Sequence, residues 1–311
     1  MKAAVINHYG DSEAIKISDN QPTPKAGAGK VLVEVHAASL NRIDSMIRAG
    51  YLQQMMPLTF PAVLGGDFSG IVREVGSDVE GIAVGDEVYG QAGALMGGSG
   101  SLAEFTTAPA EKVAKKPASL TMTDAAAFPL VGASAVQAVE EHMNIQSGQK
   151  ILIHGGAGGI GSIAIQLAKH HGAYVATTVD ETEMEIVRSF GADEVINYKT
   201  QDFTTIIKDY DAVLVTTPAV IDGSYGILKK GGVLVALAGN VDESKATDSG
   251  VTAIQQMTQA NSQQLTRLAT LIDSGKIKPL IDKTFTVANV KEAFNYFEQN
   301  APKGKVVVQV R

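Results

Sequence analysis

The middle of the chain alternates short apolar runs with longer amphipathic segments. From about residue 151 to 258, each apolar run has the length of a strand, and the segments between runs repeat apolar residues at helical spacing. The first such segment carries Ile160, Ile163 and Leu167 on one face and ends at Gly172, as a helix terminus favours. Strands that alternate with helices predict right-handed crossovers and a parallel sheet. The expected strands are 151–154, 174–178, 194–197, 212–216 and 233–238, and one later helix is expected to end at 229–231.

The segments on either side follow a different pattern, in which short strands are separated by turn residues. Strands are expected at 3–6, 31–36, 71–75 and 105–107. Glycines at positions 65, 66, 70, 76, 81, 85 and 90 have the spacing of bulges and turns, which predicts a strongly bent antiparallel barrel. Beyond residue 260 the pattern predicts a helix at 264–273, a strand at 283–287, a helix at 290–298 and a strand at 305–310. Periodicity alone leaves open whether these closing strands return to the first domain.

Composition narrows the class of protein. A chain of 311 residues is about twice the length of a typical domain, so two domains are expected. Lys and Arg number 26 against 33 Asp and Glu, and this net charge of -7 gives no electrostatic footprint for a nucleic-acid partner. The sequence contains neither a secretory signal nor an apolar run of about 18 residues, so we expect no membrane partner and a cytoplasmic protein.

Cysteine is absent from the chain. Disulfides, catalytic thiols and every zinc site that contains cysteine are therefore excluded. Glycine, in contrast, is frequent: 32 of the 311 residues are glycine, roughly 10% against an average near 7%.

The sharpest local signal is a glycine-rich turn between the strand 151–154 and the helix that follows it. Gly156, Gly158 and Gly161 form the pattern G-x-G-x-x-G. The first glycine permits a tight turn, the second lets the backbone approach a pyrophosphate, and the third lets helix and strand pack closely. The helix N-terminus supplies N–H donors to the phosphates. The residues expected to bind a dinucleotide here are Gly156, Ala157, Gly158, Gly159, Ile160 and Gly161.

Asp180 follows the second expected strand, 19 residues after Gly161. An acidic side chain at this position accepts hydrogen bonds from the ribose hydroxyls of the adenosine and repels a 2′-phosphate. Local chemistry therefore favours NAD(H). The neighbouring acids Glu181, Glu183 and Glu185 point the same way, although acids in a first helical turn also stabilise the helix dipole whatever is bound.

Several longer motifs give the whole chain a family resemblance. It resembles the medium-chain dehydrogenase/reductase superfamily, and within it the zinc-free quinone oxidoreductase branch, close to zeta-crystallin and the alkenal/enone reductases. The motifs that carry the resemblance lie at 38–44, 47–50, 60–76, 85–90, 100–105, 125–132, 190–198 and 304–308, together with the glycine-rich turn.

The resemblance implies an α/β fold in which a Rossmann doubly wound parallel sheet is inserted in a GroES-like β-barrel domain. On this basis residues 1–123 plus 261–311 are expected to form the GroES-like catalytic domain, and residues 124–260 the dinucleotide-binding domain. The family's zinc-dependent members hold their catalytic metal with two Cys and one His. The matching positions here are Asn41, Gly66 and a position between 126 and 131, so no metal site is expected.

The resemblance also implies individual site residues. Asn41 resembles the residue near the nicotinamide ribose and substrate, and Tyr198 the tyrosine at the adenosine end. Alternatively, Asn41 caps the helix that follows it, Tyr198 is a strand aromatic and Lys305 a solvated charge. Asn41 or Tyr51 is the expected hydrogen-bond donor to the acceptor oxygen. The remaining cofactor contacts that the resemblance implies are Ser134, Thr216, Thr217, Ala238, Gly239, Asn240 and Lys305.

The expected function is transfer of hydride from NADPH or NADH to a small quinone or an α,β-unsaturated carbonyl, without zinc. The nucleotide preference stays open, because the family favours NADP(H) while Asp180 favours NAD(H). The alternatives are a non-enzymatic NAD(P)-binding, crystallin-like protein and an alcohol dehydrogenase. A homodimer is expected by analogy with relatives, through an edge strand at 251–258.

Overall fold

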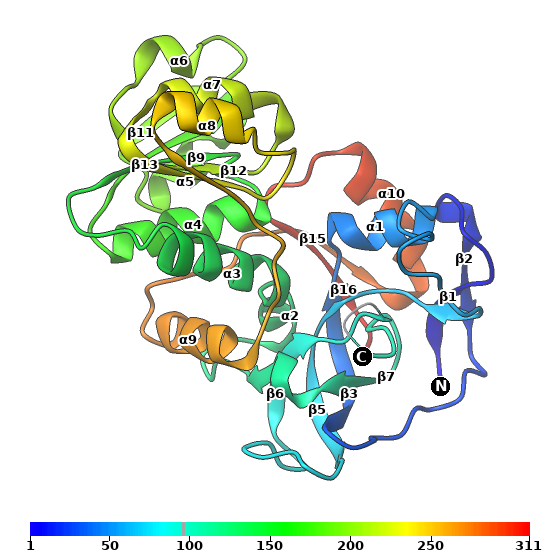
Figure 1. Cartoon of the computed structure of the whole chain (residues 1–311). Coiled ribbons are helices and arrows are strands. Elements are labelled where there is room, and N and C mark those ends of the chain that lie inside the picture. The colour runs from blue at the N-terminus through cyan, green and yellow to red at the C-terminus, as the bar shows by residue number, and fades with distance from the viewer. Residues whose placement is uncertain (95–96) are drawn as a thin grey trace. The chain divides into compact units, whose positions relative to one another are not determined.

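The computed structural model describes residues 1–94 and 97–311 and divides the chain into two units (Figure 1). The first unit contains Met1–Leu130, Ala260–Ser274 and Pro279–Arg311, so the N-terminal and C-terminal segments share it. The second unit contains Val131–Gln259 and Gly275–Lys278. Helix α2 (Met122–Ala126), near the domain boundary expected from the sequence, lies in the first unit and packs against its strands β3 and β5.

The first unit is built on two sheets. A three-stranded sheet has the order β2-β1-β4, and a larger sheet has the order β15-β16-β3-β5-β6-β8, with β7 paired to β3. The pairs are antiparallel except β15 with β16, which are parallel because helix α10 connects them as a crossover. Strand β16 pairs with β3, so the closing strands do return to the first unit. The elements are β1 (Ala3–Ile6), β2 (Ile15–Ser18), β3 (Lys30–Ser39), α1 (Arg42–Ala49), β4 (Ala62–Val63), β5 (Asp67–Val75), β6 (Glu87–Gln91), β7 (Phe105–Pro109), β8 (Val113–Lys115), α9 (Ser262–Asp273), β15 (Ile281–Thr286), α10 (Val290–Gln299) and β16 (Lys305–Gln309).

Strand β3 bends, because it pairs with β7 near its start, with β16 near its end and with β5 along its length. The register between β3 and β5 shifts twice, and Gly70 lies at the second shift. A Cβ atom on Gly70 would stand 2.1 Å from the carbonyl oxygen of Glu34. The bend therefore depends on the close backbone approach that only glycine permits here.

The second unit is a six-stranded parallel sheet of order β11-β10-β9-β12-β13-β14. Helices α7 and α8 lie on one face of this sheet and α4 on the other (Figure 1). The expected fold class, a Rossmann doubly wound parallel sheet inserted in a GroES-like β-barrel domain, is confirmed. The elements are β9 (Lys150–His154), α4 (Gly159–His170), β10 (Tyr174–Val179), α5 (Met184–Ser189), β11 (Glu194–Asn197), α6 (Phe203–Ile206), β12 (Tyr210–Val215), α7 (Ile221–Gly226), β13 (Leu228–Ala236), α8 (Glu243–Ser249) and β14 (Thr252–Gln255), preceded by α3 (Pro129–Val136), which begins in the first unit.

One expected helix end was wrong. The helix predicted to end at 229–231 ends at Gly226, and Lys229, Lys230 and Gly231 lie inside β13. Leu228 already pairs with Tyr210, so the strand begins earlier than its apolar core suggests. Two lysines followed by two glycines carry no alternating pattern, and the irregular start of the strand is therefore invisible to periodicity.

The bend of β3 generates a first prediction. Gly70→Ala should destabilise the first unit by about 1–3 kcal/mol, because its Cβ must push β3 and β5 apart. Gly27→Ala is the matched control, since nothing lies within 4 Å of a Cβ at Gly27. Urea unfolding followed by circular dichroism measures both; equal stability of the two variants would contradict the role given to Gly70.

Candidate functional site

The strand order of the parallel sheet in the second unit contains a topological switch point between β9 and β12. From β9 the chain moves outward through β10 and β11, then returns to β12 beside β9 and moves out the other way. Ligands of doubly wound sheets bind beyond the carboxyl ends of the strands at this switch point. The expected cofactor residues fall at those ends: the glycine-rich turn after β9, Asp180 after β10, Tyr198 after β11, Thr216 and Thr217 after β12, and Ala238, Gly239 and Asn240 after β13.

The three motif glycines meet different surroundings. A Cβ on Gly156 would stand 2.1 Å from Oγ1 of Thr177 on β10, and one on Gly161 would stand 2.2 Å from the carbonyl oxygen of Gly155. Both glycines are therefore required by the protein's own packing. A Cβ on Gly158 would come no closer than 3.3 Å to any atom, so the fold demands a glycine there much less. This difference fits a backbone left bare for a ligand.

Helix α4 begins immediately after Gly158, and no side chain caps its N-terminus. Its first N–H groups and the positive end of its dipole therefore face the turn, where a pyrophosphate is stabilised. Gly158, Gly159 and Ile160 are partly exposed, whereas Gly156, Ala157 and Gly161 are buried. The residues present fit the dinucleotide that the pattern predicts.

The carboxylate of Asp180 accepts three hydrogen bonds in the structure. Its Oδ1 accepts hydrogen bonds of 2.7 Å from both the backbone N–H and the hydroxyl of Thr182, and its Oδ2 accepts one of 2.5 Å from Nζ of Lys199. The bond from Lys199, with those from Thr182, lowers the pKa of Asp180 well below its usual range. The acid expected at the adenosine end therefore has a cationic partner.

Sequence reasoning missed Lys199. A signal was present, because Lys199 directly follows Tyr198, just beyond β11, and β11 pairs in parallel with β10, which ends before Asp180. The carboxyl ends of neighbouring parallel strands lie at the same edge of a sheet. Tyr198 itself is 57% exposed, which suits a surface that meets a ligand.

The other expected residues of the second unit differ in their exposure. Ser134 is buried, and its hydroxyl lies 2.8 Å from Oγ1 of Thr258. Thr216 donates its hydroxyl hydrogen bond to the carbonyl of His154 at 2.7 Å, so it ties the end of β12 to that of β9. Thr217, Gly239 and Asn240 are exposed, and Ala238 is half-buried.

In the first unit, Asn41 lies in a buried polar network. Its Nδ2 donates to Oδ2 of Asp67 at 2.9 Å, and its Oδ1 accepts from Nζ of Lys305 at 2.5 Å. Asn41 is also the N-cap residue of helix α1 and forms a capping box with Asp44, whose Oδ2 accepts the backbone N–H of Asn41 at 2.8 Å. Lys305 is buried and directed at Asn41 and Asp67, in contrast to a solvated edge charge.

Asp67 is the centre of this network and is fully buried. Its Oδ1 accepts 3.0 Å hydrogen bonds from Nε2 of Gln91 and the backbone N–H of Leu130, and its Oδ2 also accepts from the hydroxyl of Ser39 at 3.3 Å. A buried carboxylate is tolerated only when donors surround it in this way. The sequence motif around residue 67 contained this residue without indicating its role.

Asp44 has a second buried carboxyl beside this network. Burial raises the pKa of Asp44 from its ordinary value of 3.8 to about 7, and the nearby charge of Asp67 adds to this rise. The hydrogen bond from Asn41 N–H and the charge of Lys305 oppose it. Burial also lowers the pKa of Lys305.

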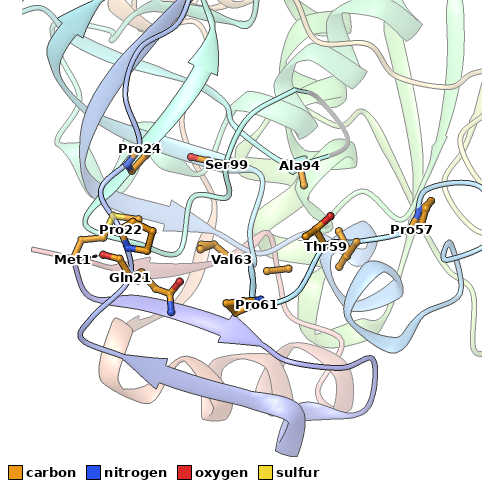
Figure 2. A pocket seen from close by; sticks show the side chains of 12 residues that line it. Met1, Gln21, Pro22, Pro24, Pro57, Thr59, Pro61, Val63, Ala94 and Ser99 are labelled. Atoms are coloured by element: carbon orange, nitrogen blue, oxygen red, sulfur yellow. Dashed lines mark hydrogen bonds between the residues drawn. The ribbon is translucent and has the colours of Figure 1, made fainter.

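Tyr51 lies in the turn after α1 and is 78% exposed, outside the network of Asn41. A separate pocket of about 430 Å³ is present on the first unit (Figure 2). Proline and other uncharged side chains line it, among them Pro22, Pro57 and Pro61, and none of the expected site residues does. Among the described residues, its lining offers no titratable side chain for chemistry, so the candidate residues are those described above within each unit.

The residues present do not fit a zinc ion. The amide of Asn41 is held by Lys305 and Asp67, and Gly66 has no side chain. In the part of the chain that the structure describes, no three His, Cys, Asp or Glu side chains gather so as to hold a metal. Within the same residues, no helix has the length and apolar character needed to cross a membrane.

Comparisons with known proteins identify the family of the chain. Residues 27–118 match the family model of the alcohol dehydrogenase GroES-like domain, and residues 190–308 match that of a zinc-binding dehydrogenase. The 2-methylene-furan-3-one reductase of Solanum lycopersicum is 37% identical over 317 residues, which cover 99% of this chain and 79% of that protein. The chloroplastic NADPH-dependent alkenal/one oxidoreductase of Arabidopsis thaliana is 37% identical over 320 residues, with the same coverage of 99% and 79%.

A solved structure, the quinone oxidoreductase from Coxiella burnetii, matches with a TM-score of 0.91 and 32% identity, covering 100% of this chain and 99% of that one. The fold and the site together define a dehydrogenase/reductase of the medium-chain type. The chain belongs to the medium-chain dehydrogenase/reductase superfamily, among relatives that are quinone and alkenal oxidoreductases.

The buried carboxyl of Asp44 generates a pH prediction. Folding raises its pKa, so its contribution to stability is present below about pH 4 and is lost as the pH rises to about 7. Asp44→Asn removes this titration while keeping an acceptor for Asn41. The free energy of unfolding of Asp44→Asn relative to the unsubstituted protein should therefore rise between these pH values, by at most about 1.4 kcal/mol per pH unit, and level off above pH 7.

Urea unfolding at a series of pH values measures this difference. Asp19→Asn, at a side chain that is 73% exposed, is the control for the loss of a carboxyl outside the network. A difference for Asp44→Asn that does not rise with pH would show that this carboxyl does not titrate in the expected range.

Proposed function

We propose that this protein is a zinc-independent NAD(P)H-dependent oxidoreductase that reduces a small quinone or an α,β-unsaturated carbonyl. The observation that carries the proposal is the bare glycine-rich turn at 156–161, which leads into the uncapped helix α4 at the switch point of the parallel sheet. The superfamily and the names of the relatives support the reaction type. When bound, the reduced nicotinamide supplies the hydride.

The acceptors named for the relatives share a conjugated carbonyl, in an alkenal, an enone or a quinone. Hydride addition forms a C–H bond and moves the electron pair of the conjugated system onto the oxygen, which then takes a proton from water. The protein has to orient the acceptor, exclude competing water and donate a hydrogen bond to that oxygen. In our proposal Asn41 is this donor, since its amide is buried and its Nδ2 carries a second N–H beyond the one that bonds to Asp67.

Alcohol oxidation by the zinc route is disfavoured, because Asn41 and Gly66 at the matching positions supply neither a thiolate nor an imidazole, and no metal-holding cluster is present among the described residues. A binding protein without turnover is the remaining alternative. One measurement separates the proposed oxidoreductase from a binding protein: only the oxidoreductase oxidises NADPH or NADH when an acceptor is added.

The test follows the absorbance of NADPH and of NADH with benzoquinone, phenanthrenequinone and methyl vinyl ketone. We expect oxidation with at least one conjugated acceptor and none with butanone, which lacks the conjugated double bond, or without an acceptor. Asn41→Ala should lower kcat/KM for the acceptor by about 100-fold. Oxidation of ethanol by NAD⁺, or no acceptor-dependent turnover at all, would overturn the proposal in favour of the first or second alternative.

Both nucleotides serve as cofactors in our proposal. Asp180 offers an acceptor for ribose hydroxyls, while Lys199, paired with it, offers a cation for a 2′-phosphate. The pair carries no net charge, so it neither strongly repels nor strongly selects the phosphate. The homodimer through β14, an edge strand of the sheet with the exposed Met257 beyond it, and the cytoplasmic location stay predictions.

Asp180→Ser should shift the nucleotide preference towards NADPH by about tenfold or more, because it frees Lys199 for the phosphate and removes the ribose acceptor. Fluorescence titration of NADPH and NADH measures the two dissociation constants without any acceptor. Asp202→Ser is the matched control: Asp202 accepts from the N–H and hydroxyl of Thr204 as Asp180 does from Thr182, and no lysine bonds to it among the described residues. If the ratio of the two dissociation constants were the same for Asp180→Ser as for Asp202→Ser, the proposed role of the Asp180–Lys199 pair in nucleotide preference would be contradicted.

A further inference from the structure

The side-chain amide of Asn41 is clamped between a cation and an anion. Nζ of Lys305 donates to its Oδ1 at 2.5 Å, and its Nδ2 donates to Oδ2 of Asp67 at 2.9 Å. An ammonium group can only donate and a carboxylate can only accept. The two contacts therefore fix which end of the amide is oxygen and which is nitrogen, and a flipped amide would face both charges with the wrong atom.

The two clamping groups are themselves fixed. Lys305 also donates to the carbonyl oxygen of Leu40 at 2.8 Å, and Asp67 is held from its other oxygen by Gln91 and the backbone of Leu130. The side chains of Lys305 and Asp67 are 5% and 0% exposed. Hydrogen bonds to charged groups are stronger in such surroundings than in water, so the amide has little freedom to rotate.

The clamp leaves one donor of Asn41 available. An amide nitrogen has two N–H groups, and among the described residues Asp67 is the sole partner of Nδ2. Donation from the ammonium of Lys305 draws electron density towards Oδ1, which makes the remaining N–H a better donor. The same contact that orients the amide therefore also polarises it.

We propose that Lys305 and Asp67 are positioning residues, which hold and polarise the Asn41 amide so that its second N–H donates to the oxygen of the hydride acceptor. This inference rests on the proposed function, in which Asn41 meets that oxygen. Hydride addition leaves a negative charge on the acceptor oxygen, and a preorganised donor stabilises that charge more than it stabilises the neutral acceptor. Lys305 then acts on the rate through Asn41 without touching the acceptor.

Lys305→Met removes the ammonium and keeps an unbranched side chain. We expect kcat for the acceptor to fall by about 10- to 100-fold, with the dissociation constant of NADPH changed less than about threefold. In the Asn41→Ala background the same substitution should lower kcat no further, because the group through which Lys305 acts is absent. A merely structural role of Lys305 predicts the same loss in both backgrounds.

Lys116→Met is the matched control in the same unit. The side chain of Lys116 is 4% exposed, its Nζ donates to the carbonyls of Pro117 and Leu120, and it pairs with Glu87 at 3.2 Å. Lys116→Met should lower the thermal midpoint of unfolding about as much as Lys305→Met does, and should leave kcat within about twofold of the unsubstituted protein. Equal kcat for Lys305→Met and Lys116→Met, or an equal loss in both Asn41 backgrounds, would overturn the inference while leaving the proposed function intact.

A second measurement needs no turnover. In the nitrogen–proton correlation spectrum of the full chain, the two side-chain N–H signals of Asn41 are identified by their disappearance in Asn41→Ala. We expect the N–H that is bonded to Asp67 to be shifted strongly downfield of its twin and to exchange slowly with water. If the two N–H signals of Asn41 lay at the chemical shifts of an ordinary asparagine side chain, Asn41 would not be held by Lys305 and Asp67, and this result would stand even if Lys305→Met failed to fold. If the unsubstituted protein reduces no acceptor, the proposed function fails, and this spectrum still decides whether Asn41 is held.

Discussion

The buried carboxylate of Asp67 is the constraint on which the first unit depends. A charge with no exposed surface is tolerated only where donors surround it, and the donors here come from four separate segments of the chain, at 39–41, 91, 130 and 305. Ser39 ends β3, Gln91 ends β6, and Lys305 begins β16, while Asn41 precedes α1. Satisfying one carboxylate therefore ties together the strand ends that carry the candidate site.

The second unit depends on a different constraint, the common direction of its strands. In a parallel sheet all carboxyl ends reach the same edge, so residues far apart in sequence meet there without any specific attraction. The glycine-rich turn, Asp180 and Tyr198 lie together for this reason. Contacts inside the protein require glycine at Gly156 and Gly161, whereas a Cβ on Gly158 meets no such close contact, so Gly158 is the glycine that we propose faces a ligand.

Much of the fold could be predicted from the sequence. Strands β1 and β11 have the predicted bounds, because a short apolar run between turn residues has few alternatives. The start of β13 was missed, since Lys229, Lys230 and Gly231 carry no period. Candidate residues at strand ends were found where a motif named them, whereas Lys199 and Asp44 were missed because their importance comes from neighbours distant in sequence.

The sequence by itself determined the class of fold, the position of the nucleotide turn and the lack of cysteine for a zinc site. These follow from local signals: periodicity, glycine spacing and composition. Only the tertiary structure decided what the polar residues do. It bonded the amide of Asn41 to Lys305 and Asp67, and it paired Asp180 with Lys199. The physical reason is that a hydrogen bond or a pKa depends on distance and burial in space, and neither quantity is encoded in the spacing of residues along a chain.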